Sequence, residues 1–72
     1  NPMDPVACML DSLKLFSKFI ISGNREYKIN LLMFLGHYSN WRLKGGFNPP
    51  DIEYGDKTMS GDEWFDHIMN TL

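Results

Sequence analysis

Hydrophobic residues are densest between Tyr27 and Trp41, where the sequence is YKINLLMFLGHYSNW. On a helix, residues of this stretch that are three or four positions apart fall on one continuous apolar stripe, which is typical of a helix with one buried face. The alternative is a strand over the short run 31–37, but leucine, methionine and phenylalanine without a β-branched run favour the helix. The stripe consists of Tyr27, Leu31, Phe34, Leu35, Tyr38 and Trp41.

A second apolar strip, made of Ile29, Leu32, Met33 and Gly36, lies beside the first. A helix that is apolar around most of its circumference is usually buried on more than one side. We therefore expect a central helix over residues 25–39, packed by neighbours on at least two faces. Gly36 costs such a helix about 1 kcal/mol relative to alanine. It is expected either to end the helix early or to allow close approach of the preceding helix.

The N-terminal segment predicts a helix over residues 5–22. Asp4 is suited to cap it, because its carboxylate can accept from unpaired backbone N–H groups, and Pro5 fits the first helical position. Gly23 can adopt the left-handed conformation that closes a helix. The apolar stripe of this helix consists of Val6, Met9, Leu10, Leu13, Phe16 and Ile20.

The C-terminal third predicts a loop followed by a short helix. Residues 42–60 are rich in glycine and proline, which favours an ordered loop pinned by apolar side chains. The alternative is a small hairpin over residues 52–59, with Gly55 and Asp56 as its two-residue turn. Ser60 and Glu63 then form a capping box at the start of a helix over residues 61–71.

These segments predict an all-α fold, a small three-helix domain with a long ordered loop between helices 2 and 3. The alternative is an α+β fold with the hairpin at 52–59. Residues 1–72 are expected to form a single domain. Residues 1–4 are expected to be a tail in which Asn1 and Pro2 remain from a cleaved tag, with Met3 as the native start of a complete small protein.

Composition limits the class of protein. A chain of 72 residues buries about 60% of its unfolded surface, so its core is thin. The single cysteine, Cys8, excludes an internal disulfide and suggests a reducing, cytoplasmic location. No apolar run approaches the roughly 18 residues of a membrane span, so no contact with a membrane is expected.

Charge is distributed unevenly along the chain. Residues 1–44 carry six basic and three acidic side chains, whereas residues 45–72 carry one basic and six acidic side chains. One interpretation is that the acidic end folds back onto the basic end. The other is a two-faced molecule that presents one sign of charge to a partner.

No arrangement of residues predicts catalysis, a metal or a cofactor. Cys8, His37 and His67 form no spaced ligand pair. The run from Asp56 to Gly61 has the first oxygen ligands of a calcium loop, but its twelfth position is His67 instead of glutamate. There is no serine elbow and no glycine-rich phosphate loop. We therefore expect a protein that is not an enzyme.

The predicted function is a small protein–protein interaction module, such as an adaptor, an inhibitor or a regulatory subunit, with a homodimer as one form. Tryptophan, tyrosine and arginine dominate binding hot spots, and they gather where the second helix meets the loop. The alternative is a nucleic-acid-associated regulator that uses the basic N-terminal half, although a pI of about 5.5 argues against it. The candidate partner-binding residues are Tyr38, Trp41, Arg42, Lys44, Phe47 and Tyr54.

Overall fold

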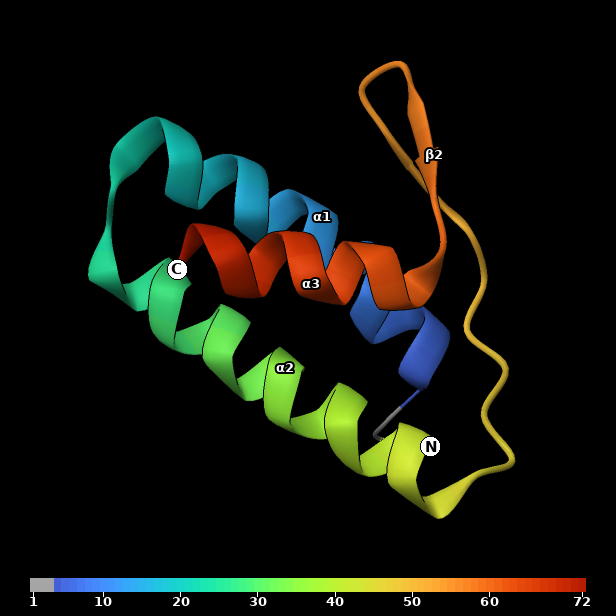
Figure 1. Cartoon of the computed structure of the whole chain (residues 1–72). Coiled ribbons are helices and arrows are strands. Elements are labelled where there is room, and N and C mark those ends of the chain that lie inside the picture. Colours follow the sequence, from blue (N-terminus) through green and yellow to red (C-terminus); the bar gives the residue numbers. More distant parts are fainter. Residues whose placement is uncertain (1–3) are drawn as a thin grey trace.

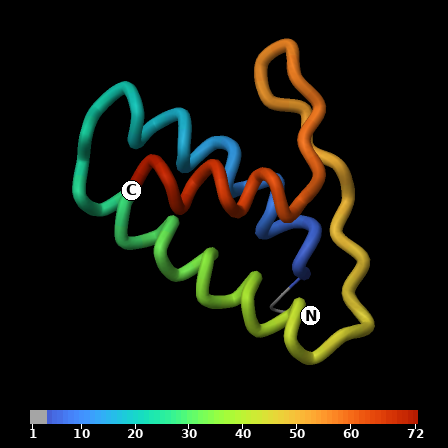
Figure 2. Tube along the Cα trace, in the orientation of Figure 1, coloured from blue at the N-terminus to red at the C-terminus, as the bar shows by residue number. Residues whose placement is uncertain are grey.

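The computed structural model describes residues 4–72, so most of the predicted tail, residues 1–3, lies outside the described residues. Three helices and one hairpin follow one another along the chain (Figure 1). α2 runs antiparallel to α1, and α3 lies along both of them (Figures 1 and 2). The elements are α1 (Pro5–Ser22), α2 (Arg25–Lys44), β1 (Ile52–Tyr54), β2 (Lys57–Met59) and α3 (Gly61–Thr71).

Both ends of α1 and the start of α3 are closed by the capping interactions that the sequence predicts. The Asp4 side chain accepts from the backbone N–H of Val6 at 3.1 Å. Gly23 closes α1 with a φ of 66°. At the start of α3, the Glu63 N–H donates to Ser60 Oγ at 3.1 Å, and the Ser60 N–H donates to Glu63 Oε1 at 2.9 Å. Each cap satisfies backbone groups that the helix itself leaves unpaired.

α2 is longer than predicted, because it continues beyond Ser39 to Lys44. Gly36 does not end the helix. It does not allow a close approach of α1 either, since a Cβ added there would meet no atom within 4 Å. The helix continues because Tyr38 and Trp41 extend its apolar stripe and pack against Phe47. The predicted loop over residues 42–60 is correspondingly shorter.

The all-α prediction is confirmed only in part, because the hairpin of the α+β alternative is present. β1 and β2 pair antiparallel, with Tyr54 opposite Lys57 and Ile52 opposite Met59. Gly55, with a φ of 63°, starts the two-residue turn. The segment 45–51 connects α2 to this hairpin.

One core joins all three helices and β1. Its largest side chain, Trp64, is fully buried, and its indole N–H donates to the buried Ser12 Oγ at 2.8 Å. Ser12 in turn donates to the backbone carbonyl of Met9. The apolar core residues are Met9, Phe16, Leu31, Phe34, Leu35, Tyr38, Ile52, Trp64 and Ile68.

The second apolar strip of α2 is not buried, which corrects the sequence interpretation. α1 and α3 both contact α2, but they cover its first stripe. The side chains of Ile29, Leu32 and Met33 remain 47%, 49% and 58% exposed. A chain of this size has too few elements to cover a helix on every side.

Candidate protein-binding surface on α2

An ionic junction fixes the C-terminal half of α2 against the start of α3. The Tyr38 hydroxyl donates to Asp62 Oδ1 at 2.6 Å. Arg42 donates to both oxygens of the same carboxylate, from Nε at 3.1 Å and from Nη2 at 2.9 Å. This pair joins the basic and acidic parts of the sequence, as the folding-back interpretation predicts.

The junction also shifts the pKa values of its members. The hydrogen bond from Tyr38 and then those from Arg42 hold the pKa of the Asp62 carboxyl below its usual range. Burial, followed by the hydrogen bond to Asp62, raises the pKa of the Tyr38 hydroxyl. The hydrogen bond to Asp62 also raises the pKa of the Arg42 guanidinium. At neutral pH the Asp62 carboxyl is therefore ionised, the Tyr38 hydroxyl is neutral and the Arg42 guanidinium is protonated. This arrangement suits a structural clamp.

The same junction holds the segment after α2. Arg42 Nη1 donates to the backbone carbonyl of Phe47 at 3.4 Å. The Phe47 ring lies edge-on to Trp41 and to Tyr38, with ring centroids 5.5 Å and 6.0 Å apart. On its other side, Trp41 stacks on His37 at 5.9 Å. These contacts pin the loop down with the aromatic side chains that the sequence analysis assigned to binding.

The six predicted partner-binding residues separate into different environments. Tyr38 is only 2% exposed and belongs to the core. Trp41 and Phe47 are half-buried, whereas Arg42 and Lys44 are exposed. Tyr54 lies in a different aromatic cluster.

The cluster around Tyr54 is centred on the core. Its ring centroid lies 5.8 Å from that of Phe16, 5.0 Å from that of Trp64 and 5.4 Å from that of His67. These contacts attach the hairpin to α1 and α3. Tyr54 therefore holds the hairpin in place and does not extend the surface at the end of α2.

The surface that the sequence analysis missed runs along α2, and we call it the outward face. Its members lie within an arc of about 100° on the helix. No charged residue occurs between Ile29 and Trp41, and Leu43 is 87% exposed. The second apolar strip was the sequence signal for this face, but it was interpreted as core. The outward face consists of Ile29, Leu32, Met33, Gly36, Asn40 and Leu43.

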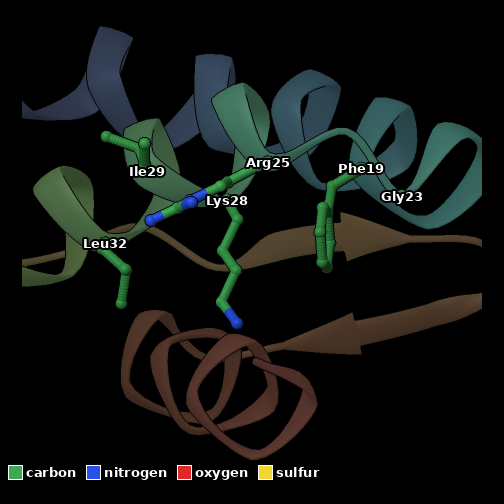
Figure 3. A pocket seen from close by; sticks show the side chains of 6 residues that line it. All are labelled: Phe19, Gly23, Arg25, Lys28, Ile29 and Leu32. Carbon is green, nitrogen blue, oxygen red and sulfur yellow. The ribbon is translucent and has the colours of Figure 1, made fainter.

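Two of the hollows beside the outward face differ in charge. Near the α1–α2 turn, a hollow is lined by Phe19, Gly23, Arg25, Lys28, Ile29 and Leu32 (Figure 3). Lys28 extends there from α2 toward α3 (Figure 3). Near the other end of α2, a second hollow is lined by Tyr38, Ser39, Arg42, Leu43, Asp62, Phe65 and Asp66. The edge facing α3 thus carries Lys28 at one end and, at the other, Asp66 beside the Arg42–Asp62 ion pair.

Other chemistry is limited among residues 4–72. No three histidine, cysteine or acidic side chains of the described part come together as a metal site. Burial raises the pKa of the Cys8 thiol, which disfavours the thiolate form needed for nucleophilic attack. Within the same range, every helix is too short or too polar to cross a membrane.

No protein-family model, curated protein or solved structure matches this chain.

Proposed function

We propose that this protein is a small, non-catalytic protein-binding module whose binding surface is the outward face of α2. The observation that carries the proposal is the row of exposed apolar side chains at Ile29, Leu32, Met33 and Leu43. Single exposed apolar residues are ordinary, but a contiguous group marks an interaction surface. An adaptor, an inhibitor or a regulatory subunit would use such a face, and a cytoplasmic location remains a prediction from the single cysteine.

The magnitude of the apolar contribution supports a modest affinity. Burying a Leu, Ile or Met side chain fully is worth about 1.5–3 kcal/mol. Ile29, Leu32 and Met33 are about half exposed and Leu43 is almost fully exposed. Burying all four in an interface is therefore worth about 5 kcal/mol of binding free energy. Association costs about 4–15 kcal/mol in lost freedom, so polar contacts around the face must contribute the rest.

The predicted residues at the end of α2 supply part of this polar and aromatic rim. Arg42 and Lys44 are exposed beside Leu43, and the half-buried Trp41 and Phe47 lie at the same end. Trp41 and Phe47 belong to the aromatic residue types that are enriched at interfaces. Tyr38 and Tyr54 support this region from the core and are not part of the proposed surface.

Substitution on the outward face tests the proposal. Met33→Glu places a charge on the outward face, and Ser17→Glu places the same charge at an exposed site on α1 as the matched control. The wild-type chain and both variants are immobilised and offered the soluble extract of the cells that produce the protein. We expect the wild type and Ser17→Glu to retain a partner protein, which is either another protein or a second copy of this chain. Met33→Glu is expected to lose it. Equal retention by all three would contradict the proposal.

The nucleic-acid alternative uses the basic residues of the N-terminal half. The charge of one of them, Arg42, is matched by Asp62 within the fold, and Lys18 lies 6.0 Å from the ring of Tyr27. Binding to phosphates would depend strongly on salt. Gel shifts with duplex DNA and with RNA at low and moderate salt test this alternative, and a salt-sensitive shift at micromolar protein would favour it over the protein-binding module.

A further inference from the structure

We propose that the outward face of α2 is occupied by a second copy of this chain, with the two α2 helices packed antiparallel about a two-fold axis. The inference rests on the proposed function and names the partner. It follows from the charges at the edges of the face, from the ends of the helices and from the area available.

The edge of the face that borders α3 is self-complementary in this arrangement. Lys28 lies on it at the start of α2, and Asp66 lies on it near the other end, beside the Arg42–Asp62 ion pair. A two-fold axis perpendicular to antiparallel helices keeps the two α3 edges on the same side and reverses their direction. Lys28 of each copy therefore faces Asp66 of its partner, and opposite charges across an interface favour the correct alignment.

The opposite edge of α2 is complementary in the same register. Glu26 and Lys44 differ by eighteen positions, which is five turns of a helix with 3.6 residues per turn, so both project to the same side. When the centre of the helix lies on the two-fold axis, Glu26 of one copy faces Lys44 of the other. Both edges therefore favour a similar alignment of the two helices.

The ends of the helices select the antiparallel arrangement over a parallel one. Arg25 lies on the same arc of α2 as Leu43. In a parallel pair the two Arg25 side chains and the two positive helix N-termini would meet, which is unfavourable. In the antiparallel pair, the two Arg25 side chains and the two helix N-termini lie at opposite ends of the interface, so this repulsion is absent.

Gly36 lies near the centre of the face and has no packing role within its own chain, since an added Cβ would meet no atom within 4 Å. Absence of a side chain there allows the backbone of a partner helix to come close. A 20-residue helix is about 30 Å long and about 10 Å wide. The face of α2 alone therefore offers about 300 Å² per copy. The lower limit of specific interfaces is about 1,200 Å² in total, or about 600 Å² per copy, so the α3 edge must contribute about half of the area. We therefore expect a dimer with a dissociation constant in the micromolar range.

Sedimentation equilibrium on the wild-type chain and on charge variants tests the inference. We expect the wild type to dimerise between micromolar and millimolar concentrations, and Met33→Glu to be monomeric. Lys28→Glu is expected to weaken the dimer about tenfold, because two attractive pairs become repulsive. Lys28→Glu combined with Asp66→Lys is expected to restore the wild-type constant, since each copy again presents opposite charges to its partner. Circular dichroism confirms that each variant is folded.

Each contrary result has a distinct meaning. A wild type that stays monomeric at millimolar concentration overturns the dimer. The proposed function is then tested separately by the capture experiment with Met33→Glu. A dimer that Met33→Glu leaves intact overturns the assignment to the outward face. A double variant weaker than Lys28→Glu alone overturns the antiparallel arrangement, because in a parallel pair Lys28 faces Glu26 and Asp66 faces Lys44 of the partner.

Discussion

Replacing Gly36 with alanine should stabilise the folded monomer. Gly36 lies within α2, with negative φ, and an added Cβ would meet no atom within 4 Å. The methyl group therefore causes no clash and gains no contact, so the effect reduces to helix propensity. Alanine is favoured over glycine in a helix interior by about 0.8–1 kcal/mol. For a domain of this size, that corresponds to a rise in melting temperature of about 4–8 °C.

The same substitution at Gly23 should have the opposite sign. Gly23 closes α1 with a φ of 66°, a conformation that costs a residue with a Cβ about 1–2 kcal/mol. The two variants thus differ only in the backbone conformation at the substituted position. If both lowered stability, the continuous course of α2 through Gly36 would be in doubt.

Urea unfolding followed by circular dichroism measures both effects. Dimerisation would add to the apparent stability of any variant. Each alanine is therefore introduced into the Met33→Glu background, which is expected to be monomeric. A Gly36→Ala change that is neutral or destabilising within this background, with an unchanged dependence on urea, would refute the propensity argument.

Three further substitutions test the packing that positions the outward face. Ser12→Ala removes the acceptor of the buried Trp64 indole N–H and should cost about 1–3 kcal/mol in thermal or urea unfolding; a cost near zero would contradict this bond. Gly61→Ala would place a Cβ 2.6 Å from that of Pro49 and should cost about 1–3 kcal/mol by the same assay; unchanged stability would show that the contact is looser. Asp62 has a lowered pKa when folded, so its stabilisation is present above its unfolded pKa of about 3.9 and is lost as pH falls through the folded value. Asp62→Asn should therefore lower the free energy of unfolding at pH 7 and reduce the part of it that is lost as the pH falls. An unaltered pH profile would count against a stabilising role for the contacts of Asp62 with Tyr38 and Arg42.

Local signals explain why much of the fold is predictable from the sequence. The caps at Asp4, Gly23 and Ser60 depend on residues within a few positions, and α1 and α3 occupy the predicted ranges. The end of α2 was not predictable in this way. It depends on Phe47 and Asp62, which pack against Tyr38 and Arg42 only in the folded chain.

The surface was harder to predict than the helices. Periodicity identified both apolar strips of α2 but carries no information on which strip the other elements cover. Tyr38 and Tyr54 were expected at a binding surface because aromatic residues suit both hot spots and cores, and burial alone separates the two roles. Ile29, Leu32 and Met33 were assigned to the core because a helix that is apolar around most of its circumference is usually buried on more than one side.

An isotope-filtered nuclear Overhauser experiment on a mixture of labelled and unlabelled chains at millimolar concentration tests the outward face and its partner most directly. Ile29 and Leu43 are separated along α2 by fourteen residues, or about 21 Å, so their methyl groups cannot give a signal within one chain. In the antiparallel dimer, Ile29 of one copy approaches Leu43 of the other, and an intermolecular signal between these two side chains is expected. Intermolecular signals only between like residues, or none at all, would contradict the antiparallel dimer.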